Sequence, residues 1–220
     1  MGFLESAVVV YLRELIYPGG FDFPLRPIAG HVAFTEIGRE ASTLVMLLTI
    51  AFIAGRNTAE KFAWFIFCFA VWDIFYYVFL KVILDWPASL LTWDLLFLIP
   101  VTWTGPVIAP VIVSMTMILL ALVLVRFTDT GLEVRINRLE WILLVFGALV
   151  VILSFTCDYS GFILEHYSFR EIWTIPKQEL FDVSLSYIPR QFRWWLFILA
   201  ELMILLATGL IYRRLNRTAP

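Results

Sequence analysis

Long apolar runs alternate with short polar segments along this chain. The runs cover residues 33–55, 62–84, 106–127, 141–163 and 194–212, and each has 19 to 23 residues. A helix of about 20 residues, rising about 1.5 Å per residue, crosses the hydrocarbon core of a membrane, which is about 30 Å thick. The pattern therefore predicts an all-α integral membrane protein: a five-span transmembrane helix bundle that forms one transmembrane domain over residues 1–220.

Two further segments are too short or too polar to span. Residues 3–17 place apolar side chains at helical spacing with three charged residues elsewhere on the helical wheel, which is typical of an N-terminal interfacial helix. Residues 88–104 form a 17-residue segment that contains Asp94 and Pro100. We expect a short outer interfacial or re-entrant helix there, over about 88–99, which ends at the proline.

Basic residues between the runs predict the orientation in the membrane. With five spans, three basic clusters fall on one side: Arg56 and Lys61; Arg126, Arg135 and Arg138; Arg213, Arg214 and Arg217. Because short cytoplasmic loops collect Lys and Arg, we expect a multi-pass protein of the bacterial inner membrane, with its N-terminus outside and its C-terminus in the cytoplasm. A sixth span over residues 88–104 would place the 126–138 loop outside, against this rule.

Charged residues inside the predicted spans mark a candidate site. Asp73 lies near the middle of the second span, and Tyr77 and Lys81 follow it on the same helix face. A charge at the centre of a spanning helix costs at least about 2.5 kcal/mol, so such residues are usually functional. The candidate acid–base residues are Asp73, Glu201, Glu36 and Glu40, and the candidate ligand-binding residues are Arg39, Tyr77, Lys81, Asp94 and Trp72.

Carboxylates outnumber cations in this outer region of the predicted bundle. Removing one partner of a buried ion pair costs about 3 to 5 kcal/mol, so pairing is expected whatever the function. The expected pairs are Arg39 with Glu36 or Glu40, and Lys81 with Asp85, Asp94 or Glu201. The surplus carboxylates must be protonated, solvated or bound to a cation.

Three functions are compatible with this cluster. The first is an outward-facing buried acidic cavity that handles protons, a cation or a small polar ligand, either alone or within a larger membrane complex. The second is a membrane-embedded enzyme that acts on a lipid or quinone-like substrate through general acid–base carboxylates. The third is a purely structural accessory subunit. We assign no cofactor, and a metal bound by His31, Glu36 and Glu40 is a weaker alternative because no HxxH, HExxH or ExxH spacing occurs.

The segment 160–193 on the same outer side is amphipathic in patches. Its apolar residues between Leu180 and Leu185 predict a short helix before Tyr187. This segment is expected to cover the outer cavity as a lid or to offer a docking surface for a partner.

Composition narrows the class of protein further. Hydrophobic residues make up 61% of the chain, against about 45 to 50% in soluble domains, so membrane lipids and other membrane subunits are the expected partners. A formal net charge of −2 gives no basic field for nucleic acid. The two cysteines, Cys68 and Cys157, lie in or at the end of apolar runs and are read as small buried hydrophobes. Walker, GxGxxG and GxSxG motifs are missing from the sequence.

Overall fold

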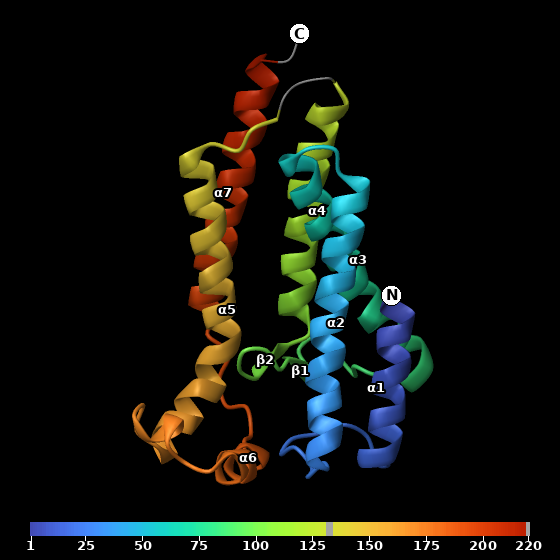
Figure 1. The fold of residues 1–220 in the computed structure, drawn as a ribbon, viewed down its shortest axis with the longest axis vertical. Coiled ribbons are helices and arrows are strands. Elements are labelled where there is room, and N and C mark those ends of the chain that lie inside the picture. Colours follow the sequence, from blue (N-terminus) through green and yellow to red (C-terminus); the bar gives the residue numbers. More distant parts are fainter. Residues whose placement is uncertain (131–133, 219–220) are drawn as a thin grey trace.

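A computed structural model describes residues 1–130 and 134–218, which form helices and one small sheet (Figure 1). The elements in chain order are α1 (Gly2–Ile16), α2 (Gly30–Ala54), α3 (Thr58–Leu84), β1 (Trp93–Phe97), β2 (Trp103–Pro106), α4 (Ile108–Asp129), α5 (Arg138–His166), the 3-10 helix η1 (Glu171–Trp173), α6 (Lys177–Leu185) and α7 (Trp194–Thr218). The predicted all-α membrane helix bundle is confirmed.

Five of these helices, α2, α3, α4, α5 and α7, are long and apolar enough to cross a membrane, as predicted. Several of these helices begin a few residues before their apolar runs, and in α3 and α5 a polar capping residue starts the helix. The Asn57 side chain accepts a hydrogen bond from the backbone N–H of Glu60 (2.9 Å) and starts α3. At the start of α5, Asn137 and Glu140 form a capping box. Such caps satisfy N–H groups that a helix terminus leaves unpaired.

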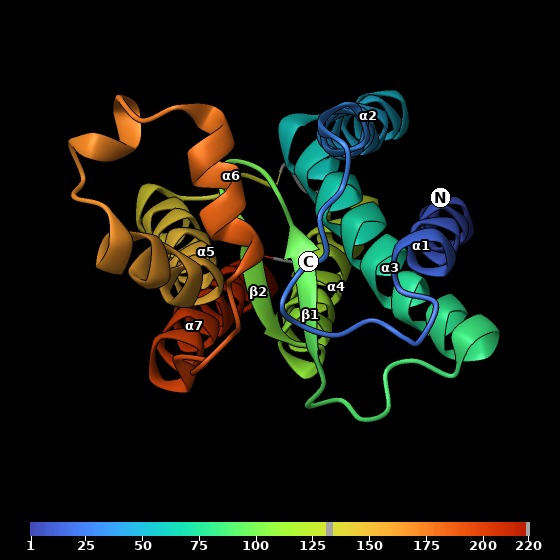
Figure 2. The same ribbon diagram turned by 90° about the horizontal axis from the view of Figure 1, so that it is seen from below.

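The helices form two groups that α4 joins. α5 packs along α7, and α3 packs along α4, while α4 also contacts α7. Gly147 of α5 allows its close approach to α7, since a Cβ atom there would lie 2.7 Å from Ile204 Cγ1. α1 and α2 both pack against α3, on the side of the bundle away from α5 and α7 (Figure 2).

The predicted N-terminal helix is present as α1 and packs against α3 (Figures 1 and 2). Gly2 sits tightly on α3, because a Cβ atom there would lie 3.0 Å from the Phe75 Cβ. The Ser6 hydroxyl contacts two carbonyl oxygens, that of Gly2 at 2.8 Å and that of Tyr76 at 3.1 Å. These contacts make α1 part of the bundle wall.

The helix expected over about 88–99 is wrong: this segment contributes β1 of an antiparallel hairpin, in which Asp94 pairs with Gly105. Prolines at positions 87, 100 and 106 lack an N–H donor and oppose a helix across this region. The aromatic and apolar residues of 93–97 favour a strand once residues 103–106 lie opposite them. The hairpin supplies its own backbone hydrogen bonds, which backbone inside a membrane protein requires.

We name the end of the bundle that carries β1, β2, residues 17–30 and α6 the hairpin end (Figures 1 and 2). The short helix predicted in segment 160–193 is α6. Tyr187, which follows it, is 1% exposed. Its hydroxyl lies 2.8 Å from the Thr104 hydroxyl of β2 and donates to Asp158 Oδ2 of α5 at 2.7 Å. These bonds fix the end of the α6 segment to the hairpin and to α5.

Candidate functional site

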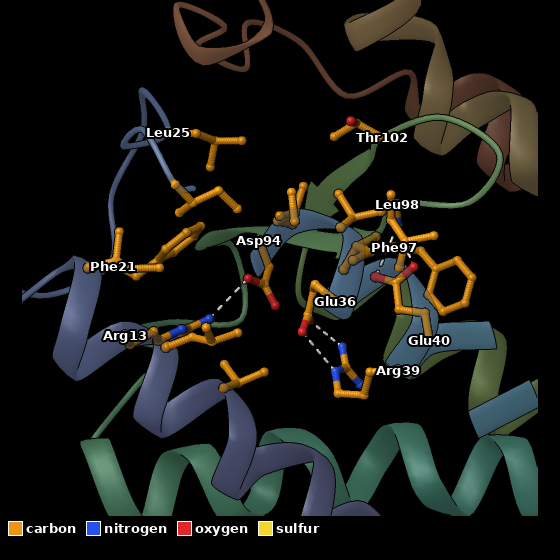
Figure 3. A pocket seen from close by; sticks show the side chains of 18 of the residues that line it. Arg13, Phe21, Leu25, Glu36, Arg39, Glu40, Asp94, Phe97, Leu98 and Thr102 are labelled. Carbon is orange, nitrogen blue, oxygen red and sulfur yellow. Dashed lines mark hydrogen bonds and ion pairs between the residues drawn. The ribbon is translucent and has the colours of Figure 1, made fainter. Parts of the chain in front are cut away.

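A cavity of about 360 Å³ lies at the hairpin end. Its walls come from α1, residues 17–30, α2, α3 and β1, with side chains of α5 and α6 closing one side (Figure 3). Most of the lining is apolar, and the volume falls within the range of about 300 to 1,000 Å³ that small-molecule sites occupy. Polar side chains enter it in separate groups.

The first group joins three elements through Asp94 of β1, which is 1% exposed. Arg13 of α1 donates to Asp94 Oδ1 through Nη2 (3.1 Å), and Tyr77 of α3 donates to Oδ2 through its hydroxyl (3.3 Å). The Arg13 guanidinium also lies over the Trp86 ring, 3.7 Å from its centroid. Burial raises the pKa of Asp94 to about 6, and the charge of Arg13 opposes this rise.

The second group centres on Arg39 of α2, on the opposite side of the cavity (Figure 3). Arg39 Nε donates to Glu36 Oε2 at 3.0 Å, as predicted, and a further guanidinium nitrogen forms an ion pair with Glu5 of α1. Burial raises the pKa of the Glu5 carboxyl, and the charge of Arg39 opposes the rise. One arginine thus holds two carboxylates and links α1 to α2.

Glu40 of α2 is paired with backbone. Its carboxylate accepts the N–H of Leu98 at 3.0 and 3.2 Å through its two oxygens. Leu98 directly follows β1, so this bond satisfies a donor at the end of the strand. Glu40 is 5% exposed and has no cationic partner among the described residues. It therefore anchors the hairpin to α2.

Asp73 occupies the middle of α3 and lines the cavity. Ser114 of α4, which is 1% exposed, donates its hydroxyl to Asp73 Oδ2 at 2.8 Å. No described residue hydrogen-bonds the other carboxylate oxygen. Trp72 and Tyr76 line the cavity from the same helix face. Asp73 is therefore the deep acid whose orientation is fixed through one oxygen while the other stays available.

Unpaired donors accompany these acids. The Nη1 atom of Arg13 and the Nε1 atom of Trp72 are buried without a hydrogen-bond partner among the described residues. The hydroxyl of Tyr76 likewise has no hydrogen bond within the described part of the chain, though its ring packs 4.9 Å from that of Tyr77. Buried polar groups are nearly always paired, so such exceptions need an explanation.

Two predicted site residues do not line the cavity, which corrects the expectation that they join Asp73. Glu201 of α7 is buried against α4, where Thr116 donates to its Oε2 at 2.7 Å. Lys81 is half exposed at the end of α3 and pairs with Asp85 at 2.7 Å, one of the pairings predicted. A shared place in the predicted outer region of the bundle therefore does not put side chains in the same cavity.

The weaker metal alternative is not supported. Residues 1–130 and 134–218 contain no group of three His, Cys, Asp or Glu side chains that could hold a metal ion. His31 is exposed, while Glu36 is engaged by Arg39 and Glu40 by the Leu98 backbone. The lining nevertheless keeps the predicted acidic surplus. It has three arginines against five carboxylates, a formal charge of −2: Arg13, Arg26 and Arg39; Glu5, Glu36, Glu40, Asp73 and Asp94.

The sequence reasoning missed the contribution of α1. Glu5, Val9 and Arg13 all line the cavity. They follow one another at i+4 spacing, which places them on one helix face. This spacing is visible in the sequence. A charged residue at each end of an otherwise apolar helix face could have indicated that α1 lines the site.

No family model matches the chain, and comparisons with curated proteins and with solved structures return no match.

Proposed function

We propose that this polytopic membrane protein binds a small molecule with a polar group in the cavity at its hairpin end, with Asp73 as the acid that faces the ligand. The observation that carries this proposal is the asymmetric pairing of the Asp73 carboxylate. Ser114 holds one oxygen at 2.8 Å, and the other oxygen has no hydrogen-bond partner among the described residues, beside a cavity of about 360 Å³. An acid in that position can accept a proton, a cation or a hydrogen bond from a ligand.

The other carboxylates of the lining are already engaged. Arg13 pairs with Asp94, and Arg39 pairs with both Glu5 and Glu36. Glu40 accepts a backbone N–H. These contacts hold the cavity walls together, so the ion pairs serve the shape of the site and leave Asp73 as its reactive group.

Occupancy of the cavity can be tested by filling it. Ala33 of α2 lines the cavity, whereas Ala41 lies on the exposed side of the same helix. The proposal predicts that mild-detergent preparations of the wild-type protein carry a bound small molecule, detected by native mass spectrometry. Ala33→Trp should lose it and Ala41→Trp should keep it. An equal occupancy in the two variants would reject the cavity as the binding site.

A lipid-directed enzyme is the second candidate, and the fixed orientation of Asp73 favours it. A general base must be held with one oxygen toward the proton that it removes, and the Ser114 contact supplies such a constraint. In this alternative, Asp73→Asn retains the bound molecule but stops its conversion, which time-resolved mass analysis of the extracted ligand would reveal. In a binding protein without chemistry, the same substitution weakens binding and no product forms.

We further propose that the hairpin end faces the outside of a bacterial inner membrane. The turn between α2 and α3, the end of α4, the start of α5 and the end of α7 all lie at the opposite end of the bundle (Figure 1). The basic clusters predicted to be cytoplasmic belong to these regions. Cysteine labelling from outside the cell should reach Ser89→Cys, which is exposed between α3 and β1, and should fail at Asn57→Cys.

A further inference from the structure

We infer that the ligand of the cavity is an uncharged amphiphile: a lipid-like molecule with a hydroxyl- or carbonyl-bearing head group and a hydrocarbon chain. This inference rests on the proposed binding function and names its ligand class. Three properties of the cavity carry it: the unpaired donors, the acidic surplus of the lining, and the apolar wall formed by α1 and α2.

The unpaired N–H donors of the cavity wall favour a ligand with oxygen acceptors. Arg13 Nη1 and Trp72 Nε1 are both buried, neither has a hydrogen-bond partner in the part of the chain that the structure describes, and both side chains belong to the cavity wall. The hydroxyl of Tyr76 adds a group that can donate or accept. A buried donor without a partner costs about 1 to 3 kcal/mol. A ligand that presents carbonyl or hydroxyl oxygens to these groups would recover that cost.

The acidic surplus disfavours an anionic head group, and the unpaired donors disfavour a cationic one. The lining has two more carboxylates than arginines, so a carboxylate or phosphate head group would add a further acidic group to a poorly solvated site. A cationic head group would be attracted by the carboxylates. It would offer no hydrogen-bond acceptor to Arg13 or Trp72, and the arginine charges would repel it. A neutral head group with oxygen atoms satisfies the donors and can give a hydroxyl hydrogen to the free oxygen of Asp73.

The remaining wall suits a hydrocarbon chain. Val9, Leu12 and Ile16 of α1 line the cavity on one side, and Ile37 of α2 lines it on another. Ile37 is 42% exposed, so the cavity wall offers apolar surface that no side chain covers. Within the described part of the chain, α2 packs extensively against α3 and has no comparable contact with α5 or α7. The apolar wall formed by α1 and α2 therefore gives a hydrocarbon chain a place to bind at the edge of the bundle.

The head-group assignment can be tested with three probes that share one acyl chain: a monoacylglycerol (neutral), a fatty acid (anionic) and a lysophosphatidylcholine (zwitterionic). Each is titrated into the delipidated wild-type protein and followed by native mass spectrometry. We expect the monoacylglycerol to bind at least about tenfold more tightly than either charged probe, which corresponds to about 1.4 kcal/mol.

A matched pair of tryptophan variants tests the contact. Trp72→Phe removes the indole N–H and keeps an aromatic ring, so it should weaken monoacylglycerol binding about fivefold. Trp103 also has a buried, unpartnered Nε1 but does not line the cavity, and Trp103→Phe should leave binding unchanged. Thermal unfolding midpoints confirm that both variants are folded.

Each other outcome contradicts the inference in a distinguishable way. Tighter binding of a charged probe that Ala33→Trp abolishes refutes the neutral head group while the cavity remains a binding site. Equal effects of the two tryptophan substitutions refute the role of the Trp72 donor. If none of the probes binds although Ala33→Trp removes a co-purified molecule, the ligand class is wrong and the binding function stands.

Discussion

Arg13 and Asp94 form a buried ion pair, 3.1 Å between Nη2 and Oδ1, across 81 positions of sequence. The contact ties the N-terminal helix to the first strand of the hairpin. It also places the guanidinium against the rings of Phe21 and Trp86, at 4.6 and 3.7 Å from their centroids. The cavity thus depends on α1 being held in place.

Replacing Arg13 with methionine should destabilise the protein by about 3 to 5 kcal/mol, because Asp94 would then be buried without its counter-charge. The thermal unfolding midpoint in detergent measures the effect. Lys81→Gln is the matched control: it breaks a solvent-exposed ion pair on the same side of the bundle and should leave the midpoint unchanged. Equal midpoints for the two variants would refute the structural role of the Arg13–Asp94 pair.

Titration of Asp94 should make stability fall between about pH 4 and pH 6. Its pKa is raised from 3.8 to about 6 on folding, so the folded protein binds this proton more tightly than the unfolded chain. The contribution is full below about pH 4, declines by up to about 3 kcal/mol as the pH rises through 6, and is constant above that. Unfolding midpoints across this range should decline in the wild type relative to Asp94→Asn. A parallel pH dependence in the two proteins would contradict the assignment.

Removing the Glu40 carboxylate should loosen the hairpin. In Glu40→Ala, the N–H of Leu98 loses its acceptor, which costs about 1 to 3 kcal/mol locally. Hydrogen exchange of the backbone over residues 93–106 should accelerate by one to two orders of magnitude. Glu40→Gln retains an oxygen acceptor and should exchange much more slowly than the alanine variant. Unchanged exchange in Glu40→Ala would show that α2 does not anchor the strand.

Gly105 and Gly161 should respond to alanine with opposite signs. A Cβ atom at Gly105 would lie 3.0 Å from Phe155 and 3.1 Å from Phe192, whereas nothing lies within 4 Å at Gly161. Gly105→Ala should cost about 1 to 3 kcal/mol through overpacking. Gly161→Ala, within the C-terminal part of α5, should stabilise the helix by about 0.5 to 1 kcal/mol. Thermal unfolding midpoints of the two variants measure both effects. Stabilisation by Gly105→Ala would contradict the packing of the hairpin on α5.

The parts of the fold that depend on local pattern could be predicted from the sequence. The spans follow from apolar run length, and two ion pairs, Arg39–Glu36 and Lys81–Asp85, follow from their i+3 and i+4 spacing on a helix. The orientation of the protein in the membrane, which is inferred from the basic clusters, stays a prediction. The role of Asp73, which is inferred from its place near the middle of a span, also stays a prediction.

The parts that depend on distant partners could not be predicted. Residues 93–97 form a strand because residues 103–106 pair with them, and a single-segment pattern does not reveal that partner. The sequence places Glu201 and Asp73 in the same outer region of the predicted bundle, but that position does not determine which neighbour a helix face meets. In the structure Glu201 faces Thr116. Arg13 contacts Asp94 because α1 packs on α3, and residue spacing within one helix does not predict that packing.

Asp73 and Glu201 provide the most direct test of the account. Both are acids of candidate membrane-spanning helices, each held by one hydroxyl, and of the two only Asp73 lines the cavity. The measurement is the fraction of protein carrying a bound small molecule in native mass spectra of the wild type, Asp73→Asn and Glu201→Gln. The account predicts that occupancy falls in Asp73→Asn and stays at the wild-type level in Glu201→Gln. Occupancy that is unchanged in Asp73→Asn, or lost equally in both variants, would contradict it.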